Sequence, residues 1–148
     1  MAAPSVKAFP AQSTQVYLYN RADQELSMYD RKYWHGAGNL PRNFKPQTTG
    51  YFQHSTYSDA ENPVAAVVYV VKKGIMWLVA WKNTSDETNK VYSEITNDFH
   101  INWEKIKEKL ENGCNHAEVT ALGYKSTLDI KANIKPNLNA KLEEATSA

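Results

Sequence analysis

The most apolar part of the chain, residues 64–81 (VAAVVYVVKKGIMWLVAW), consists of two apolar runs separated by Lys72-Lys73-Gly74. A transmembrane helix needs roughly 20 predominantly apolar residues, and charges in its middle are costly. Both runs are rich in Val, Tyr, Trp and Ile, which favour strands. Two such runs joined by a short loop containing glycine predict a β-hairpin rather than a membrane anchor.

The loop of this hairpin predicts its register. With Gly74 in the left-handed position of a three-residue loop, Tyr69 lies opposite Trp77 and Ala65 lies opposite Trp81. Because side chains alternate between the faces of a sheet, one face is wholly aliphatic and the other is largely aromatic. The aliphatic face carries Ala66, Val68, Val70, Met76, Leu78 and Ala80. The aromatic face carries Tyr69, Trp77, Val79 and Trp81. Since neither face is polar, we expect the hairpin to be central and covered on both sides.

Other alternating segments predict further strands, at residues 15–19, 26–34, 50–57, 88–95, 116–124 and 126–134. One helix is predicted near residues 102–112, where Asn102 can cap the start and Gly113 can provide a left-handed end. The spacing of Trp103, Ile106 and Leu110 gives this helix a narrow apolar stripe. We expect the stripe to pack on a sheet edge or on the aromatic side of the hairpin.

These elements predict a mainly β protein, a single-domain antiparallel β-sandwich of about eight strands with one short helix. A chain of 148 residues is long enough for one domain and too short for two ordinary ones. We expect the sandwich to span residues 15–134. Residues 1–14 are then a flexible N-terminal segment, and residues 135–148, which are polar and rich in alanine, are a flexible tail or at most a short helix.

Charge and cysteine content narrow the class of protein. The 17 basic and 16 acidic side chains leave a net charge of +1, which argues against a dedicated nucleic-acid binder. Cys114 is the single cysteine and cannot form an intramolecular disulfide, and the N-terminus shows no apolar run of signal-peptide length. Together these features point to a reducing cytosol or nucleus, or to export by an unconventional route, and we expect a cytoplasmic location.

Sequence motifs for catalysis or metal binding do not occur. The four histidines are scattered without an HExxH or CxxC motif, and there is no P-loop or G-x-S-x-G elbow. Gly36-Ala37-Gly38 lacks the third glycine of a dinucleotide loop. Cys114 follows the predicted helix C-terminus, where the helix dipole disfavours a thiolate. We therefore predict no catalytic residue, no metal and no cofactor, and expect that the protein is not an enzyme.

Aromatic residues are the unusual feature, with nine tyrosines and four tryptophans. Several tyrosines lie on strand sides opposite the aliphatic positions; these are Tyr17, Tyr19, Tyr29, Tyr33 and Tyr57. They either line a second, aromatic half of the core or form an exposed patch. If the patch is exposed, Tyr29, Arg31, Tyr33 and Trp34 are its predicted ligand-binding residues. Their rings can hold a choline group by cation–π attraction while the guanidinium takes the phosphate, or they can stack on a pyranose.

A resemblance to a plant family is carried by several strings in the same order. They are Trp34-His35-Gly36, residues 50–54 (GYFQH), 65–69 (AAVVY), 77–83 (WLVAWKN) and 89–95 (NKVYSEI), and the W-x-x-I-x-x-x-L pattern from Trp103 to Leu110. Over residues 15–134 the chain resembles the plant 23 kDa jasmonate-induced proteins. This resemblance implies a stress- or wound-induced protein without a known enzymatic activity.

The chain is also similar, at the level of fold, to actinoporin-like and fungal lipid-binding β-sandwiches, whose members recognise phosphocholine headgroups or sugars. Pore formation of the actinoporin type is not expected, because Pro4 and Pro10 interrupt the N-terminal segment. The predicted function is therefore a defence-related protein that binds membrane lipid headgroups through an aromatic patch. The alternatives are a cytosolic lectin-like carbohydrate binder and a stress-induced protein that acts through protein contacts or storage.

Overall fold

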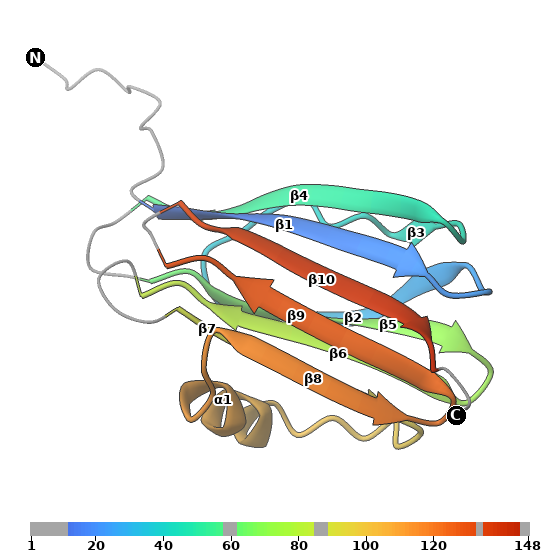
Figure 1. Ribbon diagram of the computed structural model, residues 1–148. Helices are drawn as coiled ribbons and strands as arrows, with labels where there is room; N and C mark the ends of the chain where they lie inside the picture. The colour runs from blue at the N-terminus through green and yellow to red at the C-terminus, as the bar shows by residue number, and fades with distance from the viewer. Residues whose placement is uncertain (1–11, 58–61, 85–88, 133–134, 146–148) are drawn as a thin grey trace, which may run out of the picture.

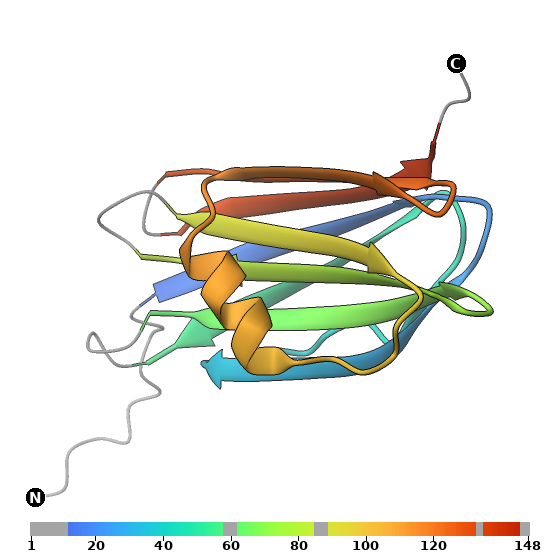
Figure 2. The same cartoon turned by 90° about the horizontal axis from the view of Figure 1, so that it is seen from below.

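The computed structural model describes residues 12–57, 62–84, 89–132 and 135–145 of the chain. It shows two five-stranded sheets packed face to face, with one helix on the outside of one sheet (Figure 1, Figure 2). The predicted mainly β sandwich with one short helix is confirmed. No helix in the described residues is both long enough and apolar enough to span a bilayer.

Sheet A has the strand order β4-β1-β10-β9-β8. Its strands are β1 (Gln12–Arg21), β4 (Thr48–Thr56), β8 (His116–Ala121), β9 (Tyr124–Ile130) and β10 (Asn137–Glu144). Sheet B has the order β3-β2-β5-β6-β7. Its strands are β2 (Leu26–His35), β3 (Asn43–Phe44), β5 (Val64–Lys72), β6 (Ile75–Lys82) and β7 (Lys90–Thr96), and the helix α1 (Trp103–Glu111) follows β7. Neighbouring strands are antiparallel except for β1 and β10, which pair in parallel.

The central hairpin is formed by β5 and β6, with the predicted register. Tyr69 pairs with Trp77 and Ala65 with Trp81, and Gly74 has a positive φ of 81° in the loop. An irregularity beside the loop pairs Lys72, not Val71, with Ile75. Because β2 and β7 flank the hairpin on either side, it lies in the middle of sheet B as expected.

The main core lies between the two sheets and contains the aromatic face of the hairpin. Trp77 and Trp81 are fully buried there. The Trp77 indole N–H donates to the Ser126 hydroxyl at 2.7 Å, and the Trp81 indole N–H donates to His54 Nδ1 at 3.0 Å. Both acceptors belong to sheet A, so the two indoles fill the core and also connect the sheets by hydrogen bonds.

The helix packs on the aliphatic face of the hairpin. Its Ile106 and Leu110 form a second cluster with Val64, Ala66, Val68, Met76, Leu78 and Ala80. The prediction that it covers a sheet edge or the aromatic side was wrong, because sheet A already covers the aromatic side. Asn102 caps the helix by accepting from the Lys105 amide at 3.1 Å. The prediction that Gly113 is left-handed was wrong. Glycine is needed there because an added Cβ would lie only 2.9 Å from the Val91 carbonyl oxygen.

The ends of the sandwich differ from the predicted boundaries. Residues 12–14 were expected in a flexible segment but begin β1, and residues 1–11 lie outside the described residues. The expected tail instead contains β10, which lies between β1 and β9 and buries Leu138, Ala140 and Leu142 completely (Figure 1). The strand predicted to reach residue 134 ends at Ile130, and Ile134 lies outside the described residues.

Candidate functional site

The four predicted ligand-binding residues all lie on β2, but the structure divides them between its two faces. Arg31 and Tyr33 pair with Val67 and Ala65, which point into the main core. Trp34 packs instead with the cluster under α1, and its ring centroid is 6.0 Å from that of Trp103. Irregular pairing between Met28 and Asp30, and between Tyr33 and His35, interrupts the alternation. The structure therefore does not form the four-residue patch that the sequence suggested.

Tyr29 lies with Trp34 on the helix side of the molecule. It is 46% exposed, and its ring meets the edge of Phe99, in the segment leading to α1, with centroids 5.3 Å apart. Trp34 lines a hollow of about 330 Å³ whose other lining residues are Glu104, Lys107, Glu108 and Glu111. Three carboxylates and one ammonium make this hollow a poor place for an anionic group.

Arg31 and Tyr33 form a fixed pair on the opposite face. The Arg31 guanidinium carbon is 5.4 Å from the centroid of the Tyr33 ring, within the range of cation–π attraction. The Tyr33 hydroxyl donates to the Gly38 carbonyl at 2.8 Å, and its ring stacks on His54 at 5.6 Å between centroids. Partial burial raises the pKa of Tyr33 and so favours its neutral phenol, which interacts with the guanidinium through the face of its ring.

A cavity of about 140 Å³, here called the arginine cavity, opens beside this pair. It is lined by Met28, Arg31, Tyr33, Gly38, Asn39, Leu40 and Arg42. Within the described part of the chain, neither Arg31 nor Arg42 forms an ion pair with a carboxylate. Asp30 accepts a hydrogen bond from the Arg31 backbone N–H. Two guanidiniums without carboxylate partners beside one cavity can bind an anionic oxygen group through several N–H donors.

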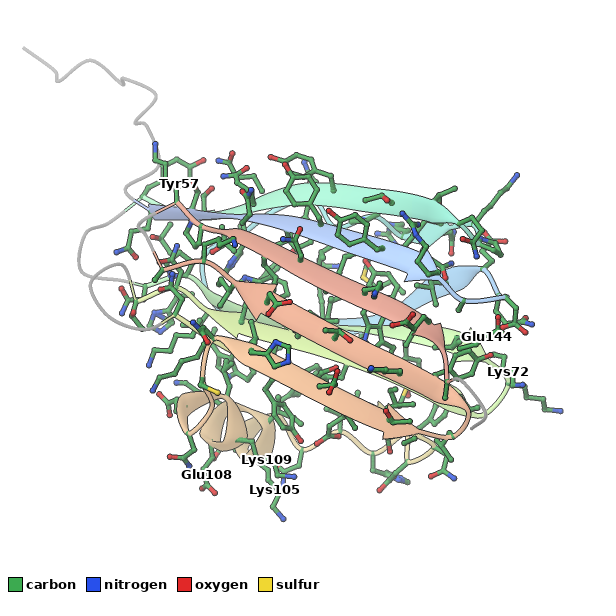
Figure 3. All side chains as sticks on the ribbon, viewed as in Figure 1. Tyr57, Lys72, Lys105, Glu108, Lys109 and Glu144 are labelled. Atoms are coloured by element: carbon green, nitrogen blue, oxygen red, sulfur yellow. The ribbon has the colours of Figure 1, made fainter. Side chains whose placement is uncertain are left out.

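A larger hollow of about 510 Å³, here called the tyrosine hollow, adjoins the arginine cavity. Its lining residues are Ala37, Gly38, Asn39, Tyr51, Phe52, Gln53 and Tyr57. Gly38 and Asn39 line both spaces. Tyr51 is 50% exposed and Tyr57 is 64% exposed. Figure 3 places Tyr57 at the end of the sandwich opposite Lys72 and Glu144.

The segment between the two spaces is held by backbone contacts with β4. Ala37 and Ser55 exchange two backbone hydrogen bonds of 3.0 Å. A Cβ on Gly38 would lie 2.5 Å from the Gln53 carbonyl oxygen, so only glycine permits this approach. The G-x-G sequence that resembled an incomplete dinucleotide loop therefore serves to lay the segment against β4 and to form a common wall for the two spaces.

A row of tyrosines continues from the tyrosine hollow over the outer face of sheet A. The ring of Tyr17 lies 4.9 Å from that of Tyr51 and 6.4 Å from that of Tyr19. Tyr19 donates to Asn139 at 3.1 Å, and Tyr51 donates to Gln15. Of the five tyrosines considered from sequence, Tyr33 packs against the main core, whereas the others lie at or near the surface. The interpretation as a second, aromatic half of the core is wrong for those four.

One further cavity, of about 270 Å³, lies under the start of α1. Its apolar wall is Val68, Met76 and Leu78, and charged residues form its rim. Two rim carboxylates have close partners: Asp98 accepts from the His100 amide at 3.0 Å, and Glu94 lies 3.7 Å from Lys109. Because these two carboxylates lie on the rim beside the single ammonium of Lys105, this cavity is a weaker candidate for an anionic ligand than the arginine cavity. Within the described residues no three His, Cys, Asp or Glu side chains are placed to hold a metal.

Comparisons with known proteins agree with this architecture. The family model described as Nakanori-like protein matches residues 10–145. The chain belongs to the Nakanori-like family. The crystal structure of the lipid binding protein Nakanori superposes with a TM-score of 0.81 at 12% identity, covering 88% of this chain and 70% of that one. The structure of the Xerocomus chrysenteron lectin XCL gives a TM-score of 0.54 at 16% identity, covering 90% of this chain and 99% of that one.

At these identities the two structures show a shared fold. The expected likeness to lipid-binding β-sandwiches is confirmed at that level by the match to Nakanori. The comparison with curated proteins gave no significant match. None of the comparisons supports the narrower resemblance to the jasmonate-induced proteins, which stays a prediction.

Proposed function

We propose that this chain is a non-enzymatic protein that binds phospholipid headgroups at the arginine cavity. The observation that carries the proposal is the placement of Arg31 and Arg42 beside one cavity without carboxylate partners among the described residues. Both arginines are exposed, and two neighbouring guanidiniums without a carboxylate partner present several N–H donors, so a pair of this kind favours an anionic ligand. Membership of a family named after a lipid binding protein supports the same function.

The proposed site keeps half of the patch suggested by the sequence. Arg31 and Tyr33 contribute as expected, with the ring orienting the guanidinium. Arg42 replaces Tyr29 and Trp34, which lie on the other face of β2. A stress- or defence-related role rests on the resemblance of the ordered motifs to those of the jasmonate-induced proteins. The single cysteine, exposed Cys114, agrees with a cytoplasmic location, where thiols stay reduced.

A vesicle flotation assay tests the headgroup proposal. Vesicles of phosphatidylcholine alone, and with phosphatidylserine or phosphatidylinositol added, present a neutral surface and two equally charged anionic surfaces. We expect binding to at least one anionic surface, weakened tenfold or more in the R31Q/R42Q variant, because each hydrogen bond to a charged group contributes about 1.5–3 kcal/mol.

The matched control is R21Q, because the Arg21 guanidinium lies 5.5 Å from the ring of Tyr19 in a similar pairing outside the arginine cavity. This variant keeps wild-type binding if the cavity is the site. Because R31Q/R42Q removes two positive charges and R21Q removes one, a loss of binding free energy in R21Q of about half that in the double variant would show that general positive charge, and not the cavity, attracts the surface. No flotation with any of the three vesicles would contradict the proposal itself.

A carbohydrate-binding function is the second candidate, and the tyrosine row on the outer face of sheet A favours it. Tyr17, Tyr19 and Tyr51 present neighbouring rings flanked by the amides of Gln15 and Asn139, a combination suited to the apolar face and hydroxyls of a sugar. The fold shared with a lectin is consistent with it. A glycan array probed with the same protein distinguishes the candidates, since neutral glycans bound without any flotation would favour the lectin.

A further inference from the structure

The two spaces on either side of Gly38 and Asn39 have complementary chemistry. The arginine cavity offers two guanidiniums, whereas the lining of the tyrosine hollow includes no charged side chain. The hollow presents two exposed rings, Tyr51 and Tyr57, and the amide side chain of Gln53. A simple anion would use only the first space, and a neutral sugar would use only the second.

The hydrogen-bonding groups of the tyrosine hollow are partly committed. The Tyr51 hydroxyl donates to Gln15, and the Gln53 amide N–H donates to the Ser55 hydroxyl at 2.9 Å. The carbonyl oxygen of the Gln53 side chain remains as an acceptor in the lining of the hollow. An acceptor next to exposed aromatic rings suits a ring that carries hydroxyl donors, and such a ring has flat C–H faces for stacking.

The sizes of the two spaces indicate which part of a ligand each one can hold. The arginine cavity, at about 140 Å³, is the smaller and suits a compact anionic group. The tyrosine hollow, at about 510 Å³, is open and larger and suits a six-membered ring. Since Gly38 and Asn39 line both spaces, the two are neighbours. A ligand that reaches over this segment, with its anionic group attached directly to its ring, places one part in each space.

We infer that the headgroup bound here is a phosphorylated cyclic polyol, the class found in inositol phospholipids. Arg31 and Arg42 hold the phosphoryl oxygens, while the polyol ring lies against Tyr51 and Tyr57 and donates hydroxyl hydrogen bonds to Gln53. This inference rests on the proposed lipid-binding function and specifies its headgroup. It also explains why the cationic arginine cavity and the uncharged tyrosine hollow lie next to each other.

Equal-charge vesicles test the inference. Phosphatidylinositol and phosphatidylserine carry the same net charge, so a purely electrostatic site binds them equally. We expect at least about tenfold tighter binding to vesicles containing phosphatidylinositol, which corresponds to about 1.4 kcal/mol. The Y57A variant should lose most of this preference while keeping the weaker, charge-dependent binding to phosphatidylserine.

The matched control is Y29A, because Tyr29 is also an exposed tyrosine but lies on the helix side. Y29A should keep the full preference, and the melting temperatures of both variants show that they are folded. Equal binding of wild type to the two anionic vesicles, or equal loss of preference in Y57A and Y29A, overturns the inference and leaves the proposed lipid binding intact.

Soluble myo-inositol 1-phosphate tests whether the ligand is a lipid headgroup or a free phosphorylated polyol. Calorimetric titration with it should show binding that R31Q/R42Q abolishes, and it should compete with phosphatidylinositol vesicles. Binding of the soluble compound without any flotation would support the headgroup chemistry and overturn the membrane proposal. No binding of the soluble compound together with no flotation overturns both.

Discussion

His54 shows at the residue scale how the core constrains a titratable group. It is fully buried on β4, accepts a hydrogen bond from Trp81 through Nδ1, and therefore carries its proton on Nε2. Within the described residues Nε2 has no hydrogen-bond partner. Burial lowers the pKa of His54 to about 4, although a backbone interaction with His35 opposes this shift more than the charge of His35 adds to it. The neutral imidazole is thus part of the folded state, and its protonation favours unfolding.

Acid should therefore destabilise the protein through His54. In the unfolded chain this histidine titrates near 6.5, so between pH 6.5 and 4 the unfolded state binds more protons and stability falls as the pH falls. We expect the wild type to lose about 2–3 kcal/mol of unfolding free energy from this group between pH 7 and pH 4.5. Urea titrations at the two pH values measure the loss.

The H54N variant keeps an acceptor for Trp81 and removes the titration. It should be less stable than the wild type at pH 7 but should lose less stability on acidification. H100N is the control, because it removes an exposed histidine and leaves the buried imidazole of His54 in place. If H54N and wild type lost the same free energy over this range, His54 would not be the group responsible.

At the scale of elements, the hairpin β5–β6 could be predicted from sequence because its loop and its alternation determine the same register. The strand β10 could not. Its residues 137–144 (NLNAKLEE) alternate strictly, but Ala, Lys and Glu are poor strand formers and common helix formers. Position between β1 and β9 overrides that propensity, because Leu138, Ala140 and Leu142 complete the main core.

The candidate site was only partly predictable for a related reason. Adjacent residues of a strand point to opposite faces, so Tyr33 and Trp34 could not share a patch on a regular strand. The position of Tyr29 depends on irregular pairing in β2, which the sequence does not mark. Arg42 lies beside β2 because its carbonyl accepts from the Met28 amide at 2.7 Å, and no local pattern links it to Arg31. The sequence predicted that aromatic and cationic side chains form the site, but only the fold shows which of these residues lie together.

A substitution on the aliphatic face of the hairpin tests how β6 and α1 depend on each other. Leu78 is 2% exposed and packs in the cluster with Ile106 and Leu110. We expect L78D to unfold the protein, since an unpaired buried carboxylate costs several kcal/mol and total stability is about 5–15 kcal/mol.

Thermal melting followed by circular dichroism measures the effect. L122D is the matched control, because Leu122 is 44% exposed and its φ of 54° is a conformation that Asp tolerates. This control should melt close to the wild type. A native-like melting temperature for L78D would show that the helix does not seal this face.

On the scale of the whole molecule, the two outer faces of the sandwich differ. The helix covers part of the outer face of sheet B (Figure 2), whereas no described element covers the outer face of sheet A. The tyrosine row lies on that uncovered face, and the arginine cavity is lined by β2 and by the segment between β2 and β3. Both candidate binding surfaces are thus on the part of the molecule that the helix leaves free.

The cohesion of sheet A depends on its last strand. Because β10 pairs in parallel with β1 and antiparallel with β9, it joins the start of the chain to the hairpin β8–β9. Without it, sheet A would consist of two separate pairs, β1–β4 and β8–β9. Two-stranded pairs are marginal in water, and the partners of Leu18 and Leu128 in the main core would be lost.

Ending the chain after Lys135 should therefore abolish cooperative unfolding, although the segment it removes was predicted from the sequence to be a flexible tail. The expected result is a loss of the thermal transition and of binding at the site, because β1 supports β4 and β4 supports the tyrosine hollow. A chain ending after Ala145 keeps all of β10 and should melt as the wild type does. A cooperative transition in the shorter chain would mean that β1 and β9 can close the sheet without β10.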